Sequence, residues 1–399
     1  MNRIIILYFL LMFLIGTDTF LISPLLPVLR ETYGISVASS GWMIGAYALG
    51  YALFALVIGP LSDGWNRKKV MLYGMIGFAV STFLCGIAPN FAVMLLFRAL
   101  SGISAAVVTP QVWASIPSVV RSHQILRAMG MVTGGLAISQ TLGVPVGAFM
   151  AARTWSLPFF LLGASALLLA VLIRFLVPDL PPGQVNRQAS GLRFLQSYRS
   201  VLTAKNGKIS FIAYFAFQLG NFAAFSFLGT WLADAYSLDV AQTGQVMMFL
   251  GLGNLLGSLF GSQAVKRFGK RGVLVFALGA AGALYLGISV SPSPFFVKAG
   301  LFAIFLLMGT LFPVMMAELQ SLSHQARGTI AALSNAVMYG ATTAGSYIAG
   351  VLYGWTGQFM AVASLTLACF VLSLGLWLKI GSREAPAQQN AARGHLREN

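Results

Sequence analysis

The sequence predicts an all-α membrane protein with twelve transmembrane helices, arranged as two six-helix bundles related by an internal repeat. Three observations support this fold class: an apolar composition, twelve long apolar runs, and motifs that recur about 200 residues apart. Hydrophobic residues make up 58% of the 399 residues and charged residues only 9%. A soluble protein of this length could not hide so much apolar surface behind so few charges.

Each of the twelve apolar runs is long enough to cross a bilayer as a helix, which takes about 20 residues. We expect these helices near 4–27, 41–61, 70–88, 91–113, 126–150, 157–178, 208–232, 242–264, 273–291, 295–317, 328–350 and 359–380. The run at 328–350 is the least apolar of them. A β-barrel is excluded, because its strands would be about half as long and would alternate polar with apolar residues.

The distribution of Lys and Arg predicts the orientation. If the N-terminus is inside, the outer loops contain only Arg30, Arg153 and Lys298, and Arg98 lies within a helix. The other 21 of the 25 basic residues then fall in inner loops and tails. Cytoplasmic loops are enriched in Lys and Arg, so we expect both termini in the cytoplasm of a multi-pass protein of the inner or plasma membrane.

Neither a cleavable signal nor a nucleic-acid partner is expected. The opening apolar run, from Ile4 to Leu26, is longer than a signal-peptide core and lacks a small-residue cleavage site. The net charge of +16 is spread over short loops between apolar segments rather than over a soluble face.

The internal repeat divides the chain. A basic turn at 59–71 has a weaker copy at 262–271, in which Gly269-Lys-Arg follows Asn66-Arg-Lys at an offset of 203. A Pro-containing segment with several basic residues separates the halves. We therefore predict an N-terminal six-helix bundle at 1–180, a cytoplasmic linker at 181–207, a C-terminal six-helix bundle at 208–381 and a disordered cytoplasmic tail at 382–399.

Asp18 and Arg98 are the two ionisable residues that the sequence places deep in the membrane. A charge at the bilayer centre costs about 3 kcal/mol or more, so such residues normally face a partner or a wet cavity. Both lie at similar depth, and we expect them to pair or to share a cavity. Such a pair either only fixes helix packing or allows the carboxylate to bind and release a proton.

The turn at 59–71 suggests a mechanical role. Gly59 permits close helix approach, and Asp63 is suited to accept from exposed N–H groups at a facing helix N-terminus. Arg67 and Lys68 are held inside by topology and anionic lipid. The alternative is a basic loop that serves topology alone.

A second motif, Gly143-Val-Pro145-Val-Gly147, lies in the fifth predicted helix. Its glycines allow close contact with another helix, and Pro145 removes a backbone hydrogen bond and bends the helix. We expect the bend to take part in opening, although packing alone would also explain these residues.

Polar and aromatic residues at mid-membrane depth are candidates for lining a substrate cavity, and helix-to-helix hydrogen bonding is the alternative explanation for each. They are Tyr47, Gln111, Gln140, Gln218, Asn221 and Asn335. A Walker loop, a Ser-His-Asp set and metal-ligand spacing are all missing from the sequence. We expect no enzymatic activity, no metal site and no cofactor other than a proton gradient.

Over nearly its whole length the chain resembles the major facilitator superfamily. Gly59, Leu61, Asp63, Arg67 and Lys68 match the motif of that superfamily between its second and third helices. The 96–102 stretch around Arg98 is similar to its fourth-helix motif, and Gly143, Pro145 and Gly147 to the fifth-helix motif of its antiporters. The resemblance implies a cavity lined by the first, fourth, seventh and tenth helices, a proton carrier at Asp18 with Arg98 as its modulator, and an inner gate at 59–71.

The expected function is secondary active transport: export of a small amphiphilic molecule or drug in exchange for protons, by alternating access. Efflux of a sugar, purine or nucleoside by the same mechanism is an alternative, as is proton-coupled uptake. A receptor or scaffold without flux is a rival from another class. The expected partners are the small-molecule substrate, protons and the lipid bilayer, and we expect a monomer.

Overall fold

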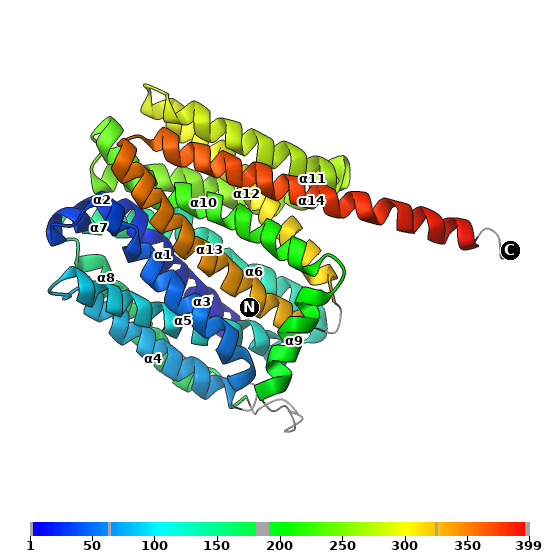
Figure 1. The fold of residues 1–399 in the computed structure, drawn as a ribbon. Coiled ribbons are helices and arrows are strands. Elements are labelled where there is room, and N and C mark those ends of the chain that lie inside the picture. The colour runs from blue at the N-terminus through cyan, green and yellow to red at the C-terminus, as the bar shows by residue number, and fades with distance from the viewer. Residues whose placement is uncertain (1–2, 63–64, 181–190, 324–325, 396–399) are drawn as a thin grey trace.

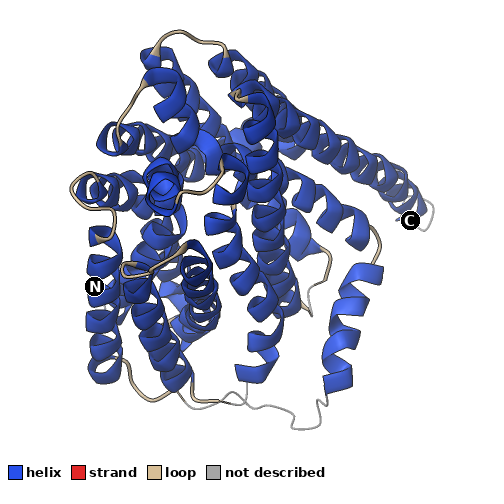
Figure 2. Ribbon diagram, turned by 60° about the vertical axis from the view of Figure 1, so that its left-hand side comes forward, coloured by secondary structure: helices blue, strands red, loops and turns tan. Residues whose placement is uncertain are grey.

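The computed structural model describes residues 3–62, 65–180, 191–323 and 326–395, with the backbone alone at 59–62, 126, 191–195, 197, 327 and 381–395. Within these ranges every regular element is a helix, and short loops join the helices (Figure 2). Most of the long helices run along one common direction (Figure 1).

The first half of the chain forms nine helical segments and one short 3₁₀ turn, η1 (Ser122–Gln124). They are α1 (Arg3–Tyr33), α2 (Val37–Ser40), α3 (Trp42–Ser62), α4 (Arg67–Cys85), α5 (Phe91–Val119), α6 (Ile125–Ile138), η2 (Ser139–Gly143), α7 (Val144–Ala151) and α8 (Leu157–Leu176). Side-chain caps begin three of them: Ser36 accepts from the backbone N–H of Ser39 at α2, Asn66 from those of Lys68 and Lys69 at α4, and Asn90 from that of Val93 at α5.

The second half forms six helical segments. They are α9 (Gly191–Thr203), α10 (Gly207–Tyr236), α11 (Val240–Ser289), α12 (Pro294–Ser321), α13 (Arg327–Thr356) and α14 (Phe359–His395). A capping box between Asp239 and Gln242 begins α11. This long segment is two helices that meet at Gly269, whose φ of 70° and ψ of 158° are not helical.

The predicted twelve-helix membrane fold is confirmed. Ten helical stretches among the described residues are long and apolar enough to cross a membrane. One of the ten is α11, which counts twice because it contains two helices. The twelfth is α13, which corresponds to the least apolar predicted run and carries the buried polar residues Ser334, Thr342 and Ser346.

Two helix ends differ from the sequence prediction. The first helix was expected to end at Pro27 but continues to Tyr33 with Pro24 and Pro27 inside it, because membrane helices tolerate proline where neighbouring helices satisfy the freed backbone groups. The tail predicted to be disordered from Ser382 continues α14 as a helix through His395. Its many Ala, Gln and Arg residues have high helix propensity.

The helices have two ends that we name by their charge. The basic end carries Arg67, Lys68 and the turn at Gly269, and the opposite end carries the loops around 34–36 and 237–239. Buried hydrophobic residues form two separate clusters, one drawn mainly from α1 to α8 and one mainly from α10 to α14. Each half of the chain therefore has a core of its own, as two bundles require.

The internal repeat also appears in helix packing. Gly50 faces the carbonyl of Ala99, and Gly257 faces that of Leu306, 207 residues later in both helices. At the same offset, Gly102 faces the carbonyl of Tyr47 and Gly309 that of Asn254. In all four contacts a Cβ would collide with a backbone oxygen, so glycine sets the close approach of α3 to α5 and of α11 to α12.

Among the described residues, three main seams join the two halves at mid-depth and toward the opposite end. In the α1–α10 seam, Ser23 Oγ donates to the Phe225 carbonyl at 2.6 Å, and Gly229 faces the Ser23 carbonyl. Proline at position 27 cannot donate to that carbonyl within α1, which leaves it available to the neighbouring helix.

The other two seams follow the same principle. Between α3 and α13, Gly41 faces the Ser346 carbonyl and Thr343 Oγ1 donates to the Gly45 carbonyl at 3.2 Å. Between η2 and α11, Gly251 faces the backbone of Gln140 and Thr141. The opposite end of the molecule is thus closed by backbone approach at glycines.

The linker helix α9 contacts both halves at the basic end. The Tyr198 hydroxyl donates to the Leu56 carbonyl of α3 at 3.1 Å, and Val201 is buried in the core of the second half. Burial raises the pKa of the Tyr198 hydroxyl to about 12, so it remains a donor throughout the physiological range. The segment predicted as a linker therefore includes an ordered bridge between the bundles.

We predict that Gly229→Ala opens the α1–α10 seam, because the new Cβ would collide with the Ser23 carbonyl. In a Thr243→Cys background, Gly229→Ala should make alkylation by a membrane-impermeant maleimide about fivefold faster. That factor corresponds to a change of about 1 kcal/mol in the equilibrium between the closed and the open seam. Thr243 is a suitable reporter because it lies beside the pocket at the opposite end and is only 2% exposed. Gly287→Ala is the matched control, since a Cβ there would have no described atom within 4 Å. Equal acceleration in both variants would contradict the assignment.

Candidate functional site

Asp18 of α1 and Arg98 of α5 form an ion pair in the first half. Nη1 of Arg98 lies 3.0 Å from Oδ1 and 2.9 Å from Oδ2 of Asp18, and both side chains are completely buried. Arg98 also donates from Nε to the Met43 carbonyl of α3 at 3.3 Å. The structure thus brings the two predicted residues together and adds α3 as a third contact.

Tyr47 covers this ion pair on the side of α3. Its ring centroid lies 4.6 Å from Cζ of Arg98, a distance at which the ring face attracts the cation. Its hydroxyl accepts a hydrogen bond from Thr19 Oγ1 at 3.1 Å, and Thr19 follows Asp18 in α1. Tyr47 was predicted to line the cavity, and it is 2% exposed. Its side chain therefore covers the ion pair and is itself shielded from solvent in this structure.

The same position in the second half is aromatic. At the offset of 207 residues, Asp18 and Arg98 correspond to Phe225 and Phe305, whose ring centroids lie 6.2 Å apart. Phe225 also contacts Phe20 of α1 at 5.5 Å, across the seam between the halves. The repeat therefore places a charge pair in one half and an aromatic pair in the other.

The polar residues of α10 share one helix face. Gln218 Nε2 donates to the Tyr214 hydroxyl at 2.9 Å, and both residues are buried. Asn221 lies three residues after Gln218 and four before Phe225, so the three share a helix face, and Phe225 on that face contacts Phe20 of α1. Among the described residues, Oδ1 of Asn221 is a buried acceptor without a hydrogen-bond donor.

The fifth membrane span is interrupted at the predicted motif. η2 is a π-helical turn directly before Val144, where the Val144 N–H bonds to the Ser139 carbonyl. Turns of this kind inside α-helices are frequent at functional sites. Gln140 of this turn accepts from Asn254 Nδ2 of α11 at 2.6 Å, a side-chain bridge between the halves. The span therefore changes helix type directly before the motif, and a bend at Pro145 stays a prediction.

The glycines of the same motif serve packing. Gly143 faces Thr17 and Gly147 faces Leu21, both on α1, and a Cβ at either position would collide with those side chains. Pro145 lies against Gly244 of α11. The motif therefore holds the fifth span against α1 and the second half at once.

Aromatic residues of α3 and α13 meet at the α3–α13 seam. The rings of Tyr51 and Tyr339 stack with centroids 3.7 Å apart, and Tyr339 lies 6.4 Å from Tyr47. Asn335 is half-buried one turn before Tyr339, on the same face of α13. Gln111 of α5 is buried at 3% exposure. Of the six predicted cavity residues, only Asn221 and Asn335 are half-exposed.

The gate motif is described in part. Gly59 and Leu61 lie in the last turns of α3, and Asp63 falls outside the described residues. Arg67 Nη1 donates to the Ala114 carbonyl of α5 at 2.5 Å. Lys68 Nζ lies 4.0 Å from Asp179. These contacts hold the start of α4 to α5 and to the end of the first bundle.

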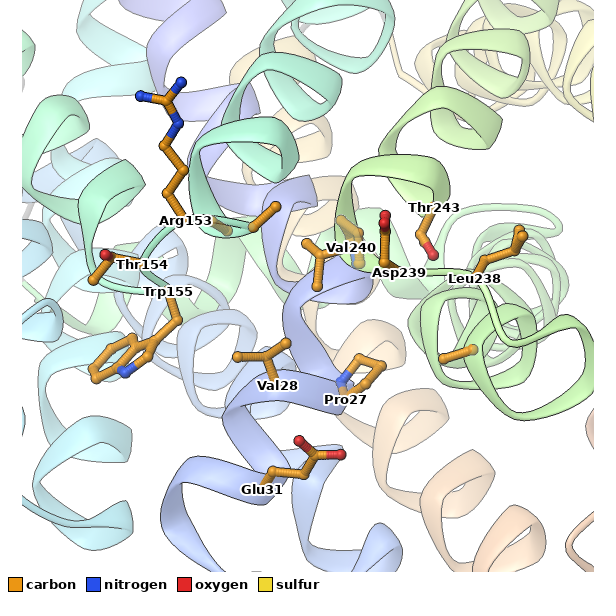
Figure 3. A pocket seen from close by; sticks show the side chains of 14 residues that line it. Pro27, Val28, Glu31, Arg153, Thr154, Trp155, Leu238, Asp239, Val240 and Thr243 are labelled. Atoms are coloured by element: carbon orange, nitrogen blue, oxygen red, sulfur yellow. The ribbon is translucent and has the colours of Figure 1, made fainter.

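A pocket of about 610 Å³ opens at the opposite end, above the closed seams. It is bounded by α1, the turn after α7 and the start of α11 (Figure 3). Glu31 and Asp239 lie on two of its sides, Trp155 lies on the third, and Arg153 points away from both carboxylates in Figure 3. None of the six predicted cavity residues lines it. It is a vestibule outside the seams, separate from the buried ion pair.

Sequence reasoning missed the residues that connect the site to the seams. The Met43 carbonyl is a backbone group, so no residue pattern reveals its bond to Arg98. Thr19 and Phe225 carry no charge, so neither stands out in the sequence as a site residue. The available signal for Phe225 is its seven-residue spacing from Gln218, which places both on one helix face. The glycines at 41 and 229 were indistinguishable from the other 41 of the 43 glycines.

Comparison with known proteins identifies the family. The sequence profile of the Major Facilitator Superfamily matches residues 8–340 and 210–398. An uncharacterized MFS-type transporter, YceJ of Bacillus subtilis (strain 168), is 50% identical over 391 residues, covering 97% of this chain and 99% of YceJ. The quinolone resistance protein NorA of Staphylococcus aureus (strain MRSA252) is 29% identical over 279 residues, 68% of each chain.

A solved structure shares the fold. The crystal structure of the nucleoside transporter NupG superimposes with a TM-score of 0.74 at 15% identity, covering 95% of this chain and 99% of NupG. At this identity the likeness concerns the arrangement of helices alone.

We predict that the ion pair behaves as one energetic unit. Asp18→Asn or Arg98→Met alone leaves a buried charge without its partner and should destabilise the protein by about 3–5 kcal/mol. The double variant should lose much less than the sum of the two single losses, because it leaves no unpaired charge. The measurement is the free energy of unfolding in detergent for the wild type, the two single variants and the double variant. Ser101→Ala is the control, a substitution at a buried neutral residue. Additive losses would show that the two charges do not interact.

Proposed function

The chain belongs to the major facilitator superfamily of membrane transporters, and we propose that it exports a small amphiphilic molecule or drug in exchange for protons. The single observation that carries this proposal is the buried Asp18–Arg98 pair, which lies beside the seams that close the opposite end. Alternating access would expose the pair and the substrate cavity to one side of the membrane at a time.

Asp18 is the proposed proton carrier. Intramembrane carboxylates are rare and costly, and they mark proton routes in pumps and transporters. Arg98 holds the ionised form in place, so release of the proton and formation of the ion pair are the same event. In the closed-seam structure the pair is fully formed, which corresponds to a carrier that has released its proton.

The proposed substrate is amphiphilic because the seam between the halves combines aromatic faces with a few polar groups. Phe20 and Phe225 supply apolar faces, and Asn221 and Asn335 supply amide groups at mid-depth. Pockets of this kind bind apolar bodies and use a few polar atoms to orient them. NorA, a relative over two thirds of the chain, is named for quinolone resistance, which is consistent with such a guest.

The remaining roles are part of the same proposal. The 59–71 turn acts as the gate at the basic end, the motif at Gly143, Pro145 and Gly147 supports export, and the protein works as a monomer. The basic end, with both termini, faces the cytoplasm. Efflux of a sugar, purine or nucleoside, and proton-coupled uptake, are alternatives that a transport assay separates by substrate and by direction.

We predict that purified protein in vesicles couples substrate movement to protons. With an imposed pH gradient and a fluorescent quinolone as probe, addition of the probe should move protons in the opposite direction. Asp18→Asn should reduce this proton movement at least about tenfold, since a 1.4 kcal/mol change suffices for that factor, while substrate counterflow persists. Glu31→Gln, at an exposed carboxylate of the vestibule, should behave as the wild type. Unchanged proton movement in Asp18→Asn would rule out Asp18 as the carrier.

We predict that Asn221 contacts the substrate through its unsatisfied oxygen. Asn221→Leu should raise KM several-fold for a probe with a hydrogen-bond donor, because one lost hydrogen bond costs about 1 kcal/mol. The same variant should transport a donor-free analogue normally. Tyr285→Phe is the control, since that buried hydroxyl also lacks a partner in the described structure but lies within the second core. An equal effect on both probes would argue against contact.

A further inference from the structure

We infer that residues 41–47, at the start of α3, transmit the charge state of the Asp18–Arg98 pair to the seam between α3 and α13, with Thr343 as a positioning residue. This inference rests on the proposed role of Asp18 as the proton carrier. It assigns a coupling element that links proton release to closure of the opposite end.

One side of this segment contacts the second half of the chain. Gly41, at the break between α2 and α3, faces the Ser346 carbonyl, and a Cβ there would collide with it. Thr343 Oγ1 donates to the Gly45 carbonyl at 3.2 Å. The Trp42 ring lies 5.4 Å from that of Tyr347. Together these contacts form the part of the α3–α13 seam nearest the opposite end.

The other side of the same segment contacts the ion pair. Nε of Arg98 donates to the Met43 carbonyl at 3.3 Å, and the Tyr47 ring lies 4.6 Å from the guanidinium carbon. Met43 lies between the two seam residues Gly41 and Gly45. Any displacement of the guanidinium is therefore applied directly to the stretch of backbone that makes the seam.

The charge of Asp18 decides where Arg98 lies. Both carboxylate oxygens accept from Nη1, so the ionised carboxylate holds the guanidinium toward α1. A neutral carboxyl attracts it far less and leaves a buried cation without its counter-ion, a state that the structure must relieve by movement or by hydration. The titratable or charged groups that interact with Asp18 from packed helices are Arg98 of α5, Tyr47 of α3 and Cys85 of α4. By ordinary values only Arg98 among these three is charged at neutral pH.

The consequence is a seam whose closure depends on pH. Ionised Asp18 favours the closed α3–α13 seam seen here, and protonation favours its opening. Because coupling between two sites is reciprocal, a weaker seam must also make Asp18 easier to protonate. A transporter with ionised Asp18 therefore stays closed at the opposite end. It is prevented from opening there while neither a proton nor a substrate is bound.

The test measures the distance across the opposite end as a function of pH. Spin labels at Thr32 of α1 and Trp355 of α13, both exposed, report on the separation of the halves in a Cys85→Ala, Cys369→Ala background. We expect a longer distance population to grow as pH falls. In Asp18→Asn the longer population should dominate at every pH.

Thr343→Val tests the route itself. Loss of the hydrogen bond to Gly45 should move the midpoint of opening to higher pH by roughly 0.5–1 unit. Thr343→Ser, which keeps the hydroxyl, should restore the wild-type midpoint. Thr342→Val is the matched control, because among the described residues the Thr342 hydroxyl bonds within α13, to the Met338 carbonyl. Its midpoint should not move.

The outcomes separate this inference from the proposed function. A wild-type distance that does not respond to pH, or a midpoint that Thr343→Val leaves unchanged, overturns the coupling route even if vesicles show proton exchange through Asp18. Loss of pH-dependent opening in Asp18→Asn together with a shifted midpoint in Thr343→Val supports the route. Proton exchange that is independent of Asp18 overturns the proposed function first and this inference with it.

Discussion

The arrangement of the first bundle depends on keeping one buried guanidinium satisfied. Arg98 is completely buried, and an uncompensated cation there would be prohibitively costly. Its donors reach the Asp18 carboxylate of α1 and the Met43 carbonyl of α3. Three helices from different parts of the chain must therefore keep a fixed distance and rotation. A change in the charge of Asp18 or Arg98 therefore alters the contacts among all three helices.

The second half shows what the same fold does without this constraint. The positions equivalent to Asp18 and Arg98 are Phe225 and Phe305, which pack through their rings. Aromatic packing tolerates small shifts that a buried ion pair does not, since it lacks the steep distance dependence of opposite charges at low dielectric. The repeat thus places a buried charge pair in one bundle and an aromatic pair at the equivalent position of the other.

Much of this fold could be predicted from the sequence, because membrane spans need long apolar runs and buried charges need partners. Asp18 and Arg98 were expected to meet for that reason, and they do. The seams could not be predicted, since a glycine matters only where another backbone approaches it, as Ser23 approaches Gly229. The helical end of α14 was missed because polar composition suggests disorder, although intrinsic helix propensity is high there.

Closure by glycines suits a contact that must open again. A seam made by interlocking large side chains would be stabilised by several kcal/mol of buried area, and no single protonation could reverse it. Aromatic pairs such as Trp42–Tyr347 and Tyr51–Tyr339 lie in the α3–α13 seam, but at Gly41, Gly229 and Gly251 backbone lies against backbone, which reduces the side-chain area buried at those points. The free-energy difference between closed and open seams can then stay within the few kcal/mol that one ion pair is able to shift. On this argument the glycines and the charge pair form one device, in which the glycines keep the seam weak enough for Asp18 to control it.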